Sequence, residues 1–302
     1  MSTNQTVIIS ANPKSGSFSR HGLVLELKHE VESLGFQCEV HTDLDQMANR
    51  CHELIQTTEL RTVVAAGGDG TASKVASLIP HGVPLTLFPT GSENLLAKYY
   101  FITADPAACA RSIQKLRTNP IDVMMVNGRL SLLMTSIGFD AEVVRCVHQR
   151  RKSHVTKLTY WTAIIGTLFR YRWPVLKISI FDENDRIIEE VLGGWVFVFN
   201  VPRYASGLSI MDDAVEHDGY LDVGIFDQGG LVRNMWYYWH VIRGKHQFLK
   251  QWRRYRSRSI RIENADLTGS RGSQTSCQAD GDWVCELPVS IKITTRSLRI
   301  VG

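Results

Sequence analysis

RTVVAAGGDGT, at residues 61–71, is the stretch that decides the predicted fold. Its first part, Arg61–Ala66, is rich in β-branched and small apolar residues, which is typical of a short buried strand. Three glycines, a carboxylate and a hydroxyl follow at once, and Ala72–Leu78 predicts a helix. A strand, a glycine turn and a helix start in this order present backbone N–H groups to a phosphate. An ordinary glycine-rich turn would have the same sequence, so the context of the loop has to decide.

The single carboxylate of this loop limits which ligands the loop could bind. Like charges repel, so Asp69 is not suited to contact a bare phosphate. It makes sense where it orients a cation or a reacting hydroxyl group. Glycine tolerates a positive φ and lets a ligand approach the backbone, so Gly67, Gly68 and Gly70 suit the same purpose. The loop therefore predicts a nucleotide-handling site.

The first third of the chain alternates predicted strands with predicted helices, which is typical of a parallel sheet covered on both faces. In such sheets ligands bind beyond the carboxyl ends of the strands. Three candidate loops, at residues 12–16, 67–71 and 89–94, all follow predicted strands. The predicted strands are 6–11, 37–42, 61–66 and 84–88, and the predicted helices are 19–34, 44–57 and 72–78.

The pattern changes after about residue 119. Asn127-Gly128 separates two apolar runs, 121–126 and 129–136, and indicates a β-hairpin. Most of the later segments also have the character of strands. We therefore predict an N-terminal α/β domain with a parallel sheet, residues 1–125, and a C-terminal antiparallel, β-sandwich-like domain, residues 126–302. Further strands are expected at 175–181, 187–200, 221–226, 257–263 and 289–295, with helices near 141–149, 158–170 and 231–243.

The composition excludes several classes of protein. A formal net charge of +4 and 44% hydrophobic residues are ordinary for a globular protein, and this balance does not demand nucleic acid. The six cysteines form no C-x-x-C pair and the histidines no H-E-x-x-H pattern, so we expect reduced thiols, no zinc site and a cytoplasmic protein. No secretory signal is visible, and the longest apolar helical run, about 160–169, is too short to span a bilayer.

Two loops beside the glycine loop are candidates for phosphate contacts. Residues 12–16, Asn-Pro-Lys-Ser-Gly, offer backbone amides, a hydroxyl and a positive charge, although a plain turn is an equal alternative. Residues 89–94, Pro-Thr-Gly-Ser-Glu-Asn, offer a glycine, a hydroxyl and an amide at a helix start, where a simple N-cap is the alternative.

Two acidic stretches lie in the second half of the chain. Asp218 follows several carboxylates at 213–218 and could hold Mg²⁺ with nearby carbonyl oxygens, and a solvated acidic turn is the alternative. Asp280 and Asp282 flank a glycine, and both would point to the same side if the backbone were extended. A hairpin turn built on Asp280-Gly281 is the alternative there.

Taken together, these stretches resemble the diacylglycerol kinase catalytic family, a fold shared by bacterial lipid kinases and sphingosine kinases and distantly related to NAD kinases. The resemblance covers nearly the whole chain, and six short motifs occur in the order of the family. These are Asn12-Pro13-x-Ser15-Gly16, Gly67-Gly68-Asp69-Gly70-Thr71, Gly91-Ser92-x-Asn94, Gly138-Phe139-Asp140-Ala141, Asp218-Gly219-x-Leu221-Asp222 and Asp280-Gly281-Asp282.

The resemblance implies an ATP-binding α/β domain, a β-rich lipid-binding domain and an active site in the cleft between them. It implies that Asp218 holds a structural Mg²⁺ beside the carbonyls of Val215 and Tyr220. The candidate base is Asp280, slightly favoured, or Asp282, which stands where the family usually has glutamate. The residues placed at ATP are Asn12, Ser15, Gly16, Gly67, Gly68, Asp69, Gly70, Thr71, Ser92 and Asn94, with Thr42 as a looser match.

The expected reaction is transfer of the γ-phosphoryl group of Mg-ATP to the hydroxyl of diacylglycerol or a related membrane lipid. Asp69 would hold a catalytic Mg²⁺ or the acceptor hydroxyl, and Asp280 or Asp282 would take its proton. A sphingoid base or another lipid alcohol, a soluble NAD-kinase-like reaction and a non-catalytic nucleotide-binding role stay open.

The sequence also suggests how the chain could meet a membrane. Two basic runs, 149–152 and 252–258, could contact the inner face of a membrane, although solvated or paired charges are an alternative for both. The aromatic run 236–239 could be an interfacial anchor or part of the core. A homodimer is left open.

Overall fold

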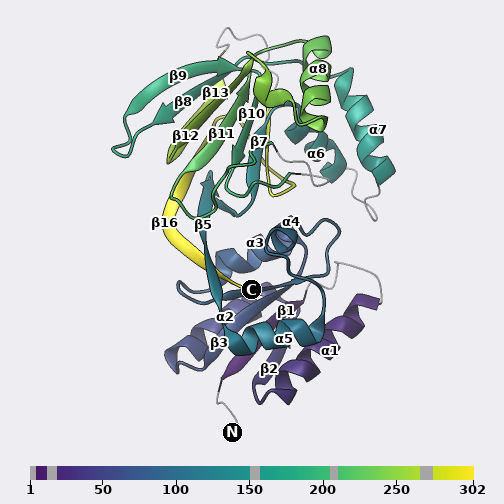
Figure 1. Ribbon diagram of the computed structural model, residues 1–302, viewed down its shortest axis with the longest axis vertical. Coiled ribbons are helices and arrows are strands. Elements are labelled where there is room, and N and C mark those ends of the chain that lie inside the picture. Colours follow the sequence, from purple (N-terminus) through teal and green to yellow (C-terminus); the bar gives the residue numbers. More distant parts are fainter. Residues whose placement is uncertain (1–4, 12–18, 150–156, 205–209, 266–274) are drawn as a thin grey trace. The chain divides into compact units, whose positions relative to one another are not determined.

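The computed structural model describes residues 5–11, 19–149, 157–204, 210–265 and 275–302 (Figure 1). The chain divides into two compact units. The first unit comprises Met1–Val123 and Thr295–Gly302, and the second unit comprises Met124–Thr294. The sequence analysis divided the chain only once, at residue 125, whereas the structure returns the last eight residues to the first unit.

The first unit is an α/β domain built on a parallel sheet, as predicted. The strand order is β2-β1-β3-β4-β16, and neighbouring strands in this order run parallel to each other. Its elements are β1 (Thr6–Ala11), α1 (Ser19–Ser33), β2 (Gln37–His41), α2 (Leu44–Gln56), β3 (Leu60–Gly67), α3 (Asp69–Leu78), β4 (Leu85–Pro89), α4 (Leu95–Tyr99), α5 (Pro106–Lys115) and parts of β5 (Thr118–Val126) and β16 (Val289–Val301).

Burial explains why these strands lie in the middle of the unit. β1 is buried along its whole length, and so is β3 from Thr62 onward. Parallel strands of this kind need cover on both faces. One face packs against α1 and α5 around Ile9, Leu27 and Ile113, while α2 and α3 contact the same strands without joining that cluster.

The C-terminal strand closes the parallel sheet at its far edge. Ile300 pairs with Leu85 beside β4, and the N–H of Gly302 donates to the carbonyl of Arg117. The guanidinium of Arg296 donates to two carbonyls at the end of α3, Ala76 and Ile79, at 2.8 Å each. A cation at a helix C-terminus satisfies carbonyls that the helix leaves unpaired. The sequence pattern predicted a strand only over 289–295, and predicted neither its extension to Val301 nor its return to the first unit.

The second unit is a sandwich of two mainly antiparallel sheets, as predicted. One sheet has the order β12-β11-β10-β7-β14-β15, and the other contains β16-β13-β8-β9 together with the β5–β6 hairpin. Its other elements are β6 (Arg129–Ser131), β7 (Met134–Ile137), α6 (Phe139–Gln149), α7 (Lys157–Leu168), β8 (Leu176–Phe181), β9 (Ile187–Gly193), β10 (Trp195–Phe199), β11 (Leu221–Phe226), α8 (Leu231–Ile242), a 3₁₀ turn (His246–Phe248), β12 (Trp252–Ser257), β13 (Ser259–Asn264), β14 (Ser276–Ala279) and β15 (Asp282–Glu286).

A single apolar core fills the space between these two sheets. Val198 and Val223 from the six-stranded sheet meet Ile178, Ile260 and Ile291 from the other, and all five side chains are fully buried. The outer side of the six-stranded sheet carries helices, since α6 contacts β7, β14 and β15 and α8 packs on Phe226 of β11.

Two predicted strands proved to be two strands each. The runs 129–136 and 187–200 are interrupted at Leu132-Leu133 and Gly194. At every interruption the chain leaves one sheet and enters the other. The apolar pattern continues through each crossing because both sheets bury their inner face in the same core. Hydrophobicity alone therefore could not locate the breaks.

Among the described residues, no helix combines the length and the apolar character needed to cross a bilayer.

Candidate functional site

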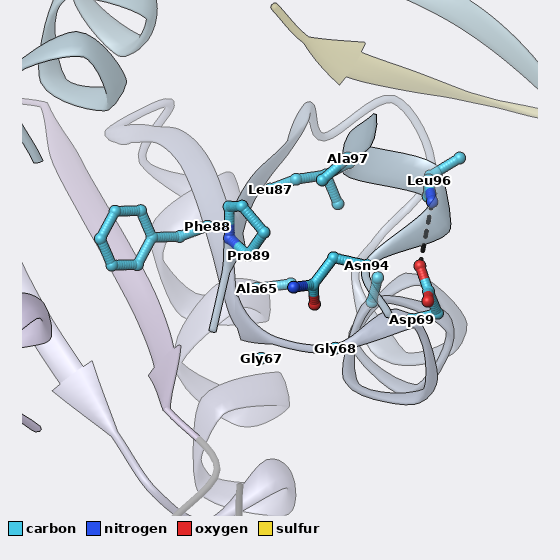
Figure 2. A pocket seen from close by; sticks show the side chains of 11 residues that line it. Ala65, Gly67, Gly68, Asp69, Leu87, Phe88, Pro89, Asn94, Leu96 and Ala97 are labelled. Atoms are coloured by element: carbon cyan, nitrogen blue, oxygen red, sulfur yellow. Dashed lines mark hydrogen bonds between the residues drawn. The ribbon is translucent and has the colours of Figure 1, made fainter. Parts of the chain in front are cut away.

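The glycine loop and the loop at residues 89–94 lie together in the first unit, at the carboxyl ends of the neighbouring strands β3 and β4 (Figure 2). The N–H of Thr90 donates to the carbonyl of Gly67 at 3.1 Å. Gly68 and Gly91 approach so closely that a Cβ built on Gly91 would lie 2.3 Å from the Cα of Gly68. Only glycine fits at residue 91, because backbone occupies the space of its side chain.

The glycines of this loop serve close approach and not an unusual backbone conformation. Gly67, Gly68 and Gly70 are absent from the described residues with positive φ, and Gly68 has φ −94° and ψ −172°. A Cβ on Gly67 would lie 2.3 Å from Oγ1 of Thr71. The tolerance of glycine for a positive φ is therefore not used here, and the close approaches that these glycines allow are to other parts of the chain.

Asp69 ties the two loops to each other. Its Oδ2 accepts a hydrogen bond from the N–H of Leu95 at 2.9 Å, and its Oδ1 accepts one from the N–H of Leu96 at 3.0 Å. The carboxylate therefore caps the first turn of α4, a role that stabilises helix starts.

Asn94 completes the second loop. It lies in the left-handed region with φ 51°, its Oδ1 accepts from the N–H of Gly91, and its Nδ2 donates to the carbonyl of Gly91, both at 3.0 Å. Figure 2 shows the side chain of Asn94 above Gly67 and Gly68, and Asp69 facing the backbone of Leu96. A cavity of about 10 Å³ lies behind the loop, which is room for about one water molecule. A nucleotide would have to lie outside it, beyond the strand ends.

The first turn of α3 is the feature that could meet an anion. Its N-cap residue, Gly68, has no side chain that could bond the helix N–H groups. The helix is ten residues long, so its N-terminus carries a partial positive charge at the end of β3. Thr71 is buried on this turn, and Ser92 of the neighbouring loop is exposed.

The other predicted nucleotide contacts are less close or are not described. β1 separates β2 from β3, so strand spacing places the exposed Thr42 about 10 Å from the glycine loop. Asn12, Ser15 and Gly16 lie outside the described residues.

In the second unit, Asp280 and Gly281 form a two-residue turn between β14 and β15. Ala279 pairs with Asp282 across the hairpin, and both turn residues have positive φ, 51° and 82°. This is the geometry of a tight hairpin turn, the alternative that the sequence left open. Asp280 and Asp282 do not lie on one extended strand, so the argument that placed them on one side by their spacing was wrong.

The carboxylate of Asp280 is fully engaged by the chain itself. It accepts hydrogen bonds from the hydroxyl of Ser131 at 2.8 Å and from the N–H groups of Leu132, Leu133 and Met134 at 2.9, 2.9 and 3.2 Å. These are the residues where the chain crosses from one sheet to the other, so their N–H groups have no ladder partner. Asp282 makes a looser contact, with Arg129 at 3.5 Å.

A second buried carboxylate, Asp140, was quoted in a motif but given no role by the sequence analysis. At the start of α6 it accepts hydrogen bonds from Ser136, from Nε1 of Trp195 at 2.7 Å and from the hydroxyl of Tyr204 at 3.1 Å. Burial raises the pKa of Asp140, and these hydrogen bonds oppose that rise. The sequence feature that could have indicated a buried carboxylate is an aspartate flanked by apolar residues in Gly138-Phe139-Asp140-Ala141.

The Asp140 network reaches the hairpin turn. Ser136 receives a hydrogen bond from Nε2 of Gln278 at 2.7 Å, and Oε1 of Gln278 accepts from the N–H of Gly281 at 2.9 Å. A continuous polar chain therefore connects α6 to the Asp280-Gly281 turn through the buried face of the sheet.

The residues predicted to hold Mg²⁺ form an arrangement of a different kind. Asp218 accepts from the N–H of Tyr220 at 3.0 Å and pairs with the guanidinium of Arg256. Among the described residues, no group of three or more acidic, histidine or cysteine side chains is placed to hold a metal. Asp218 thus pairs with an arginine, and the Mg²⁺ site at Asp218 with the carbonyls of Val215 and Tyr220 stays a prediction.

Asp222 lies beside this pair and is only 4% exposed. Burial raises the pKa of Asp222 to about 6; Arg256 opposes the rise, and the nearby Asp218 adds to it. Asp218 precedes β11 and Asp280 follows β14 at the same end of the six-stranded sheet. Three strand steps separate β11 from β14, so the two carboxylates lie about 14 Å apart.

The basic run 252–258 proved to be ion-paired. Most of it forms β12, where Arg253 pairs with Asp227, Arg254 with Asp213 and Arg256 with Asp218. These charges are satisfied within the second unit and do not form a free basic surface. Of the run 149–152, residues 150–152 lie outside the described part of the chain.

Comparisons with known proteins agree over both units. Residues 6–126 match the diacylglycerol kinase catalytic domain, and residues 134–302 match the YegS C-terminal NAD kinase beta sandwich-like domain. The chain is similar to a diacylglycerol kinase of Mycobacterium tuberculosis, with 24% identity over 308 residues that cover 96% of this chain and 93% of the relative.

Two further similarities are narrower in what they show. A probable lipid kinase of the YegS-like type from Pseudomonas aeruginosa is 36% identical over 102 residues, which is 33% of each chain. The crystal structure of a diacylglycerol kinase from Bacillus anthracis aligns with a TM-score of 0.64 at 15% identity, covering 99% of this chain and 96% of that one. The structural likeness supports the fold.

Replacing Gly91 by alanine should destabilise the first unit. The new Cβ would lie 2.3 Å from backbone of Gly68, so the two loops must separate, at a cost of about 1–3 kcal/mol. Thermal unfolding measures the loss. Gly22→Ala is the control, because nothing lies within 4 Å of its Cβ and alanine favours a helix. Equal melting temperatures for the two variants would contradict the close approach.

Asp222→Asn should change how stability depends on pH. The folded pKa is raised from 3.8 to about 6, so the contribution of wild-type Asp222 is fully present below about pH 4 and is lost as the pH rises through 6. The variant cannot ionise and should gain up to about 3 kcal/mol relative to wild type at pH 8, but nothing at pH 4. Urea unfolding at both pH values tests this. A difference that is independent of pH would contradict it.

Proposed function

Because this chain belongs to the diacylglycerol kinase catalytic-domain family, we propose that it is an ATP-dependent lipid kinase. It transfers the γ-phosphoryl group of ATP, with Mg²⁺ as the companion ion of the nucleotide, to the hydroxyl of diacylglycerol or a related membrane lipid. The observation that carries the proposal is the pair of loops pinned together at the ends of β3 and β4, beside a helix start that has no side-chain cap.

The first unit supplies the electrostatics that phosphoryl transfer requires. The transition state spreads negative charge over the phosphoryl oxygens, so catalysis depends on positioning and on fixed positive dipoles. The start of α3 and the amides of Gly67–Thr71 are such dipoles, and their place is fixed by the contact of Gly68 with Gly91. Asp69 holds this geometry through Leu95 and Leu96, and we propose that its negative charge also serves a cation or the acceptor hydroxyl.

The second unit supplies the candidate base. A base must offer a lone pair to the proton that it takes. The carboxylate of Asp280 is occupied by four donors of its own chain, which favours a positioning role for it. We therefore propose Asp282, the other acidic residue of the motif, as the base, which reverses the order of preference taken from the sequence.

The lipid is proposed only as a class. A sphingoid base or another lipid alcohol would use the same chemistry, because specificity in an apolar pocket depends on packing. The second candidate is a soluble kinase that acts on a nucleotide, since the second unit matches a family described as NAD kinase beta sandwich-like. For a lipid substrate we propose a cytoplasmic protein that works as a peripheral protein at the inner face of the membrane.

Asp69→Asn should reduce turnover by about 10²–10³-fold, because the amide cannot accept both N–H groups and carries no charge for a cation. Transfer of radiolabelled phosphate from ATP into a total lipid extract, with the product identified by mass, measures turnover. Asp105→Asn is the matched control, since Asp105 caps α5 through the N–H of Ala108 in the same way but away from the loops. It should lose at most about 1 kcal/mol of stability and no activity.

Near-normal turnover of the Asp69→Asn protein would overturn the assignment of the site. Formation of NADP by the wild-type protein without any labelled lipid would favour the soluble reaction instead.

Asp280→Asn and Asp282→Asn should separate stability from catalysis. The first removes a charge that four donors solvate and should cost about 3 kcal/mol of unfolding free energy. The second breaks one exposed pair and should cost less than about 1 kcal/mol, yet it should lose most of the turnover. Urea unfolding and the lipid assay are read together. An active Asp282→Asn protein would exclude Asp282 as the base.

A further inference from the structure

The outer face of α8 is apolar although it is exposed. Val232, Met235, Trp236, Trp239 and Ile242 are between 42% and 82% exposed. At 3.6 residues per turn these five positions cover an arc of about 120° on one side of the helix. Phe248, in the turn that follows, is 84% exposed. Contiguous apolar surface of this kind marks an interaction site. We call these six side chains the α8 face.

The opposite side of α8 is fixed to the second unit, so the helix cannot rotate to bury the α8 face. Tyr237 is fully buried and stacks on Phe226 of β11, with ring centroids 4.6 Å apart. Nδ2 of Asn234 donates to the carbonyl of Gly229 at 2.7 Å, and Val241 is 3% exposed. Figure 1 shows α8 lying beside the strands that it covers. The exposed arc is therefore a fixed feature of the fold.

The segment that carries the α8 face has only basic charges of its own. Residues 228–252 contain no aspartate or glutamate and four basic residues, Arg233, Arg243, Lys245 and Lys250, all exposed. From outside the segment, Asp212 accepts a hydrogen bond from Gln247, the neighbour of Phe248, at 3.3 Å. The four exposed basic side chains give the segment a positive net charge.

Two other surfaces of the second unit differ from the α8 face in their charges. The arginines of β12 are paired with carboxylates, as described above. On β9 the exposed Ile187, Ile188 and Leu192 are interleaved with Glu189 and Glu190. An apolar surface with acidic neighbours is repelled by an anionic partner, whereas the α8 face is attracted to one.

We propose that the α8 face docks this protein on a bilayer that contains anionic lipid. Tryptophan rings prefer the interface between headgroups and acyl chains, and a helix with an apolar face and basic flanks lies in the plane of that interface. Basic residues at its rim add attraction to anionic headgroups. The choice of a bilayer over a protein partner rests on the proposed lipid kinase activity, which requires access to a membrane-bound substrate.

Vesicle co-sedimentation without ATP tests the docking apart from catalysis. Wild-type protein should bind vesicles of phosphatidylcholine mixed with phosphatidylglycerol more tightly than phosphatidylcholine alone, and less tightly as salt increases. Trp239→Ser and Val232→Ser should each weaken binding about tenfold and keep its salt dependence. Lys245→Gln and Lys250→Gln should each weaken it about fivefold and reduce the salt dependence.

Ile188→Ser and Lys292→Gln are the matched controls, because both residues are exposed in the second unit outside the α8 face. They should bind vesicles as wild type does, and circular dichroism should show that all variants are folded. Brominated lipid should quench the fluorescence of the wild-type protein more than that of Trp239→Ser.

Unchanged vesicle binding by Trp239→Ser would overturn the docking surface. The same would follow if light scattering showed a wild-type dimer that Trp239→Ser dissociates without loss of vesicle binding, because the face would then join two copies of the chain. The kinase activity is measured separately, on lipid dispersed in detergent micelles. Failure of that assay with intact α8-dependent vesicle binding would reject the proposed function and leave the docking surface standing.

Discussion

The contact between Gly68 and Gly91, locked by Asp69, is the constraint on which the first unit depends. Two loops from neighbouring parallel strands meet backbone to backbone, and one carboxylate bonds the first N–H groups of α4. The same carboxylate sits on the first turn of α3. The position of one helix start is thus coupled to the other, so the dipoles offered to a phosphate are set before any ligand arrives.

Buried carboxylates perform a similar task in the second unit. Asp280 bonds the N–H groups at a point where the chain leaves one sheet for the other, and Asp140 bonds three side chains at the start of α6. Each carboxylate accepts hydrogen bonds from buried donors that have neither a partner in a β-sheet nor access to water. An acidic residue in a family motif can therefore serve the fold, and its contacts distinguish this role from a catalytic one.

The distribution of arginine and lysine divides the surface of the second unit into two kinds of region. On β12 the arginines face carboxylates from neighbouring turns, so their charge is neutralised locally. Around α8 no acidic residue is available within residues 228–252, and the positive charge remains for an external partner. Counting charges along the chain would rank β12 as the more basic surface, and the ion pairs reverse that order.

The sequence by itself determined the class of both units. Alternating strands and helices required a parallel sheet, and the Asn127-Gly128 and Asp280-Gly281 pairs marked hairpins, because these signals depend on local backbone preferences. The convergence of the loops after β3 and β4 also followed, since carboxyl ends of parallel strands share one edge.

Only the tertiary structure decided which partner each polar group found. The bonds of Asp69 to Leu95 and Leu96, of Asp280 to Leu132 and Leu133, and of Asp218 to Arg256 join residues between 26 and 148 positions apart. The crossings between sheets and the return of the last strand to β4 could not be predicted from the sequence for the same reason. Local sequence preferences do not encode a partner that is distant along the chain, because the folded core brings the two together.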